Sequence, residues 1–130
     1  MKKTVQVAIA LICCNEQILI GWRDQKLHQG GCYEFAGGKI EANETPMEAC
    51  RREVQEEVGI SIDNWQLYQE IIHEYDDKIV HLHFFKSDVS LAVTEQISAP
   101  WQWVKRADLH LYAFPEANKN IIEQLQQENI

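Results

Sequence analysis

Glutamates gather in residues 38–60, which read GKIEANETPMEACRREVQEEVGI. Glu53, Glu56 and Glu57 are three or four residues apart or adjacent, so on a helix they share one arc of the surface. Like charges at this spacing repel by about 0.2–0.5 kcal/mol per pair, and a bound cation reverses the sign of that interaction. Mg²⁺ is held by one or two carboxylates together with substrate phosphates. The arrangement indicates a divalent-metal site for phosphate chemistry, with a solvated acidic helix face as the alternative.

The helix that would carry these glutamates has its own start and stop signals. Thr45 can cap it, Pro46 suits the first helical position, and Glu48 completes a capping box. Gly59 supplies a left-handed stop. Helical periodicity predicts an apolar stripe that faces the core, formed by Met47, Cys50, Val54 and Val58.

The complete spacing of this segment, Gly38-x5-Glu44-x7-Arg52-Glu53-Val54-x-Glu56-Glu57-x-Gly59-Ile60, resembles the Nudix box at every defined position. The resemblance implies the Nudix fold, an α/β/α sandwich with a mixed β-sheet and the Nudix loop-helix-loop. It also implies a Mg²⁺ cofactor for which Mn²⁺ can substitute. The length of 130 residues predicts one domain over residues 1–130, large enough to bury a single core.

The elements around the box fit an α/β protein. Strands are expected at residues 5–13 and 17–22 around an Asn15-Glu16 turn, and at 32–35 before a Gly37-Gly38 turn. A second pair is expected at 65–75 and 79–87 across Asp76-Asp77, with one more strand at 101–104. A last helix would open at Pro115 and end near Gln127, with a core face of Ile121, Ile122 and Leu125.

Composition restricts the partners. The chain of 130 residues carries 12 basic and 20 acidic residues, a net charge of −8, which is unfavourable for binding a nucleic-acid polymer. Gln6 interrupts the apolar N-terminal run, which is too short to span a membrane and reads as a strand rather than a signal peptide. The four cysteines lack metal-site spacing and are expected to be reduced in a cytoplasmic protein. The protein is expected to be a monomer or a homodimer.

Residues outside the box resemble the MutT branch of the Nudix family. These are residues 34–41 (EFAGGKIE), the opening Met1-Lys2-Lys3 and the late Phe114-Pro115-Glu116-Ala117-Asn118. The resemblance implies hydrolysis of 8-oxo-dGTP, and of dGTP, to the monophosphate and pyrophosphate. Ala36 departs from the proline that MutT has before its two glycines. The Phe-Ala-Gly-Gly-Lys version and residues 79–83 (IVHLH) also resemble pyrophosphohydrolases of CTP and 5-methyl-dCTP. A nucleotide-sensing module without catalysis is the alternative of another class.

By the same resemblance, Glu53, Glu56 and Glu57 hold the metal together with the Gly37 carbonyl. Glu53 is expected to activate the attacking water, with Glu56 as its rival. Arg52 orients the glutamates by charge-assisted hydrogen bonds.

Three further residues are considered for the phosphate chemistry. Glu95 is either a further metal ligand or a solvated loop acid. Glu44 supports the loop rather than the metal, and Lys39 meets phosphate or lies on the surface.

Base recognition is expected from residues outside the box. Asn118 offers a donor and an acceptor that match the O6 and protonated N7 of 8-oxoguanine, or it is an ordinary helix residue. Phe35 lies against the base or in the core. The substrate-contacting positions implied by the resemblance are Arg23, His28, Glu34, Phe35, Ala36, Gly37, Lys39 and Asn118.

His81 and His83 alternate on an expected strand and so share a face. They could chelate a metal, but zinc normally takes three or four protein ligands and the sequence shows no third ligand beside them. The pair is therefore not interpreted as a metal site.

Overall fold

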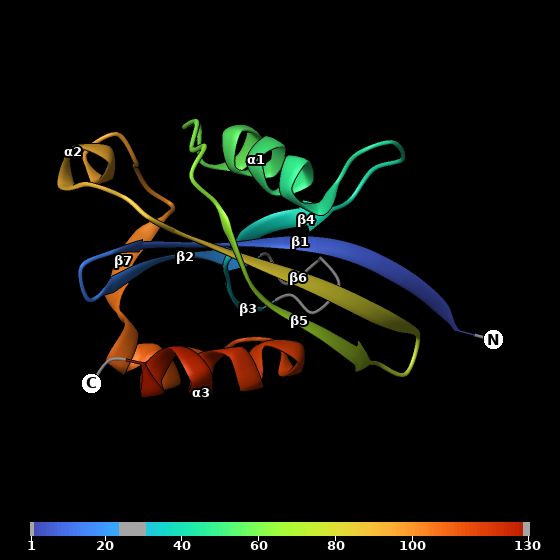
Figure 1. The fold of residues 1–130 in the computed structure, drawn as a ribbon. Helices are drawn as coiled ribbons and strands as arrows, with labels where there is room; N and C mark the ends of the chain where they lie inside the picture. The colour runs from blue at the N-terminus through green and yellow to red at the C-terminus, as the bar shows by residue number, and fades with distance from the viewer. Residues whose placement is uncertain (1, 24–30, 129–130) are drawn as a thin grey trace. The chain divides into compact units, whose positions relative to one another are not determined.

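The computed structural model describes residues 2–23 and 31–128 (Figure 1). The chain forms two compact units. The first comprises Met1–Leu11 and Ala36–Ser87, and the second comprises Ile12–Phe35 and Asp88–Ile130. Strand β1 (Lys3–Cys14) contributes to both. No helix among the described residues is long and apolar enough to cross a membrane.

The first unit is a sheet with one helix, α1 (Pro46–Glu57), packed on β4 (Ala36–Lys39). The strand order is β4, β1, β6 (Lys78–Asp88) and β5 (Gln66–Glu74). Strand β4 runs antiparallel to β1, with Lys39 opposite Val7 and Ala36 opposite Ala10. The side chains of Ala8 and Ala10 are small, and both residues are buried. Strands β5 and β6 form an antiparallel hairpin with a register shift between Leu67 and Gln69.

The second unit contains the strands β2 (Gln17–Arg23), β3 (Cys32–Glu34) and β7 (Gln102–Lys105). Strand β2 is central, because it pairs with the end of β1, with β3 and with β7. The helical segments are α2 (Leu91–Thr94), η1 (Arg106–Leu111), η2 (Glu116–Asn118) and α3 (Lys119–Gln127). Helix α3 contacts η1 and buries the predicted face of Ile121, Ile122 and Leu125.

Most predicted elements are confirmed within one or two residues, but the Gly37-Gly38 turn is wrong. Both glycines lie inside β4, opposite Ile9 and Ala8 of β1. Glycine is required there because the strand comes very close to β1: a Cβ on Gly37 would lie 2.2 Å from the Ala8 carbonyl oxygen. Gly37 therefore permits close strand pairing, and the glycine pair does not reverse the chain.

Two smaller predictions also need correction. Met47 is 39% exposed, and Ala49 is fully buried, so the core face of α1 is formed by Ala49, Cys50 and Val54. The last helix begins as the 3₁₀ turn η2 rather than as an α-helix at Pro115. The four cysteines are buried thiols outside any disulfide, as expected.

Candidate active site

The start of helix α1 is fixed by the predicted capping box. The Thr45 hydroxyl accepts from the Glu48 amide at 3.1 Å, and the Glu48 carboxylate accepts from the Thr45 amide at 2.8 Å. Pro46 occupies the first turn, where its missing amide proton costs no hydrogen bond. Cys50 and Val54 are fully buried on the neighbouring face of the helix, and their burial fixes the rotation in which the helix presents its glutamates.

Arg52 is the centre of the acidic cluster. Its Nε and one terminal nitrogen donate to the two oxygens of Glu44 at 2.8 and 2.9 Å, a bidentate pair. That terminal nitrogen also donates to the Lys39 carbonyl at 3.0 Å, which ties the helix to the end of β4. The second terminal nitrogen of Arg52 donates to Glu53 at 3.1 Å and to Glu56 at 3.0 Å. These carboxylates raise the pKa of Arg52, so it remains charged.

The glutamates predicted to bind metal differ in their surroundings. The Glu53 side chain is 15% exposed, whereas that of Glu56 is 59% exposed. Each uses one oxygen for Arg52, and among the described residues the other oxygen has no hydrogen-bond partner. Glu57 instead accepts from the Gly37 amide at 2.9 Å, which joins α1 to β4 a second time.

Gly38 makes room for Glu53. A Cβ on Gly38 would lie 2.3 Å from Glu53 Oε2, so the carboxylate rests directly against the β4 backbone. Lys39 follows with an exposed side chain, and its carbonyl rather than its ammonium group makes the contact with Arg52. The two glycines thus have separate parts, since Gly37 allows strand pairing and Gly38 accommodates the carboxylate.

The cluster suits a hard divalent cation. Its donors are carboxylate oxygens, the ligands that Mg²⁺ and Mn²⁺ prefer. Glu53 and Glu56 are held by a single nitrogen of Arg52, so their remaining oxygens are available on neighbouring turns of one helix. The prediction that Arg52 hydrogen-bonds the glutamates is confirmed, and the donor set fits the expected metal.

Glu44 accepts from Arg52 and from the Glu41 backbone amide at 2.8 Å, as predicted for a residue that supports the loop. The bond from Arg52, followed by the bond from the Glu41 amide, lowers the pKa of Glu44 to about 2. A carboxyl whose pKa falls on folding stabilises the native state above its unfolded pKa, and this contribution disappears as the pH falls through the folded pKa.

We therefore expect Glu44→Gln to lower the free energy of unfolding near neutral pH and to have a shrinking effect as the pH falls from about 4.5 to about 2. Urea denaturation of the wild type and the variant at several pH values in this range measures the difference. Glu123→Gln, which removes an exposed glutamate from α3, is the control and should show no such pH dependence. A difference independent of pH would contradict the assigned pKa.

The residues assigned to base recognition belong to the second unit. Asn118 is 9% exposed and occupies the N-cap of α3, yet its side chain makes no capping bond. Among the described residues the side-chain amide of Asn118 has no hydrogen-bond partner, although an asparagine side chain at this position commonly caps the helix. Phe35 is 4% exposed and stacks on Phe114 with ring centroids 4.9 Å apart, so its ring is mainly part of the core.

The other predicted positions have varied surroundings. Glu34 lies in β3 opposite Gly21, and Ala36 is buried opposite Ala10. Glu95 is exposed at the C-cap of α2, a short helix that was not predicted. The side chain of Arg23 and the whole of His28 lie outside the described residues.

Comparisons with known proteins agree with this geometry. The model of the NUDIX domain matches residues 7–124. The chain belongs to the Nudix family. Its helix α1 and the preceding loop are the Nudix box, on the Nudix fold of a mixed sheet with helices, and the protein is a Nudix hydrolase.

Individual Nudix relatives extend the match to nearly the whole chain. The 8-oxo-dGTP diphosphatase of Escherichia coli (strain K12) is 33% identical, over 96% of this chain and 98% of the relative. The CTP pyrophosphohydrolase of the same organism is 36% identical, over 62% of this chain and 60% of the relative. A MutT structure from a study of the Aliivibrio salmonicida and Vibrio cholerae proteins superimposes with a TM-score of 0.75, at 29% identity, covering 97% and 99% of the two chains.

Sequence reasoning missed two contributors to this Nudix site. The Lys39 carbonyl was not foreseen, because a backbone contact depends on where β4 ends rather than on residue type. The glycine pair in the sequence does indicate a special role for Gly38, but it predicts a turn rather than space for the Glu53 carboxylate.

Proposed function

We propose that this Nudix hydrolase is a Mg²⁺-dependent pyrophosphohydrolase that converts 8-oxo-dGTP, and dGTP, to the monophosphate and pyrophosphate. The observation that carries the proposal is the acidic cluster of α1, in which Arg52 holds Glu53 and Glu56 side by side and Glu57 accepts from the Gly37 amide. An acidic protein needs such a metal-binding cluster to accept a triphosphate, because its net charge of −8 repels the substrate.

In this proposal the cation, held by Glu53, Glu56, Glu57 and the Gly37 carbonyl, would neutralise phosphate charge and polarise the scissile phosphoanhydride. Glu53 accepts the proton of the attacking water. Its partial burial favours that role over Glu56, because a carboxylate packed against the β4 backbone is held in a more fixed position than an exposed one. Arg52 holds both carboxylates in place, and its hydrogen bonds leave it no part in the transfer itself. Lys39 meets phosphate, and Glu95 is a further ligand.

The substrate preference rests on the relatives and on Asn118. The match to the 8-oxo-dGTP diphosphatase spans nearly both chains, whereas the match to the CTP pyrophosphohydrolase covers less than two thirds of either. The unused Asn118 amide can accept from the protonated N7 of 8-oxoguanine and donate to O6. Unmodified guanine has an acceptor at N7, so this pairing favours the oxidised base. Arg23, His28, Glu34, Phe35 and Ala36 complete the proposed nucleotide contacts.

The two units are proposed to form one Nudix domain over residues 1–130, because the family match runs from residue 7 to residue 124 across both. The free state of the four cysteines supports a place in the cytoplasm, where the nucleotide pool lies. A monomer or a homodimer is compatible with this proposal.

The proposed function is tested by kcat/KM with Mg²⁺ for 8-oxo-dGTP, dGTP, CTP, 5-methyl-dCTP and ADP-ribose. We expect 8-oxo-dGTP to give the highest value and pyrophosphate to be the second product. A higher value for CTP or 5-methyl-dCTP would select the alternative pyrophosphohydrolase. No hydrolysis of any nucleotide, with binding retained, would make the protein a nucleotide-sensing module.

Replacing Asn118 with alanine should lower kcat/KM for 8-oxo-dGTP by about tenfold or more, because the hydrogen-bonding groups of the base lose their partner in a buried place. The value for CTP should change much less. Asn120→Ala removes an exposed amide two residues further along and should leave both values unchanged. Equal losses for the two nucleotides would remove Asn118 as the base-recognition residue.

A further inference from the structure

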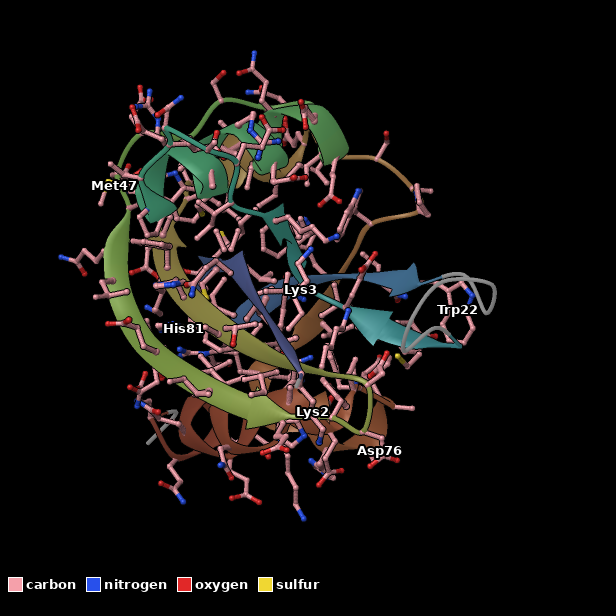
Figure 2. The ribbon with its side chains drawn as sticks, turned by 90° about the vertical axis from the view of Figure 1, so that its right-hand side faces the viewer. Lys2, Lys3, Trp22, Met47, Asp76 and His81 are labelled. Carbon is pink, nitrogen blue, oxygen red and sulfur yellow. The ribbon has the colours of Figure 1, made fainter. Side chains whose placement is uncertain are left out.

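A compact cluster of two histidines and a glutamate lies on the β5–β6 hairpin, where Figure 2 labels His81. His81 and His83 share one face of β6, and the register places Glu70 of β5 opposite His83. One ligand atom from each residue can be chosen so that all three lie within 4.8 Å of one another. Glu70 thus supplies the third ligand whose absence from the sequence pattern had argued against a metal site.

The distances within the cluster resemble those of a metal site. Glu70 Oε1 is 3.0 Å from His81 Nε2 and 3.4 Å from His83 Nδ1. In a tetrahedral zinc site with bonds of about 2.0–2.2 Å, neighbouring ligand atoms are roughly 3.3–3.5 Å apart. The side chains therefore need only small rotations to surround an ion.

A hydrogen bond to Gln6 determines which nitrogen of His83 is available. His83 Nε2 lies 2.8 Å from the Gln6 carbonyl oxygen, which can only accept, so Nε2 carries the proton. In the neutral ring Nδ1 then presents a lone pair toward the Glu70 carboxylate, and two acceptors face each other at 3.4 Å.

A metal ion between the two acceptors would remove this conflict. The contact with Gln6 is of the kind that fixes the tautomer and orientation of a metal-bound histidine. The His81 and His83 rings are stacked, with centroids 4.2 Å apart, so both imidazoles are already directed along the same face. His81 would bind through Nε2, the atom that now contacts Glu70, with its proton on Nδ1.

We propose that Glu70, His81 and His83 bind Zn²⁺, with Gln6 as the outer support of His83 and a fourth position open to water. Imidazole ligands suit zinc, whereas Mg²⁺ prefers the all-oxygen set of the α1 glutamates. The ion would join β5 to β6 and, through Gln6, hold β1 in place. This site is separate in sequence and in ligand chemistry from the hydrolase site.

Zinc binding is measured on untagged protein, stripped of metal and returned to excess Mg²⁺, by competition with a chromophoric chelator. We expect one Zn²⁺ per chain and a higher Tm when zinc is bound. His81→Ala and His83→Ala should abolish this binding, Glu70→Gln should weaken it, and Gln6→Ala should weaken it by about tenfold. His73→Ala, on the opposite face of β5, is the matched control and should bind as the wild type does.

Because zinc could also enter the acidic cluster, Glu53→Gln is titrated in parallel and should keep the bound Zn²⁺. Ring ¹⁵N NMR of the wild type checks the ligands without any substitution, and His81 Nε2 and His83 Nδ1 should shift on zinc addition. The proposal is overturned if the wild type binds no zinc, or if the resonances of these two nitrogens do not shift. It is also overturned if the histidine variants still bind zinc. Hydrolysis is assayed separately, so either proposal can fail alone.

Discussion

Glu53→Gln is expected to lower kcat for 8-oxo-dGTP by about 10²–10⁴-fold, the range for loss of a general base. The amide keeps the size of the side chain but cannot accept the proton of water, and it is a poorer metal ligand. It can still accept from Arg52 through its carbonyl oxygen, so the packing between α1 and β4 should persist. The free energy of unfolding should therefore change little while turnover collapses.

Parallel variants separate the base from its neighbours. Glu56→Gln tests the rival base. We expect it to lower kcat less than Glu53→Gln does, because the Glu56 side chain is 59% exposed. Glu123→Gln removes an exposed glutamate from α3 and controls for net charge. Single-turnover rates and Mg²⁺ titrations are measured for all three. Near-normal kcat in Glu53→Gln, or a larger loss in Glu56→Gln, would contradict the assignment of Glu53 as the base.

The parts of this site that could be predicted from the sequence are local. Thr45, Pro46 and Glu48 define the start of α1 within four residues. Helix periodicity alone then predicts that the side chains of Arg52, Glu53 and Glu56 are neighbours on the helix surface. No distant partner has to be known for either inference. The resemblance to the Nudix box added the chemistry, and the family match agrees with it.

The parts that could not be predicted depend on strand pairing between distant residues. Glu70 is eleven residues from His81, and only the hairpin register brings their atoms to 3.0 Å. Similarly, Gly37 and Gly38 look like a turn in isolation, because the groups that require them are distant in sequence: β1 for Gly37 and the Glu53 carboxylate for Gly38. A glycine pair indicates that another group comes close to the backbone, but it does not indicate which group.

The same glycine pair allows fold and catalysis to be separated by two adjacent substitutions. Gly37 has φ of +153°, which side chains rarely adopt, and its Cβ would collide with the backbone oxygen of Ala8. We expect Gly37→Ala to lower the free energy of unfolding by at least about 1–3 kcal/mol, since neither backbone can move without breaking the strand pairing. Urea denaturation measures this loss.

Gly38→Ala should instead lower kcat strongly and the free energy of unfolding only slightly. The three atoms nearest its Cβ would all belong to the carboxylate of Glu53, the end of a flexible side chain that can move away at small cost. Displacement of Glu53 breaks its bond to Arg52, so we expect a stability loss below about 1 kcal/mol. We expect a fall in kcat of about 10²-fold or more, as for loss of the base itself.

In Glu53→Gln protein the further change Gly38→Ala should then cost little activity, because the carboxylate it displaces is already gone. Full activity in Gly38→Ala, or additive losses in the double variant, would mean that catalysis does not need Glu53 against β4.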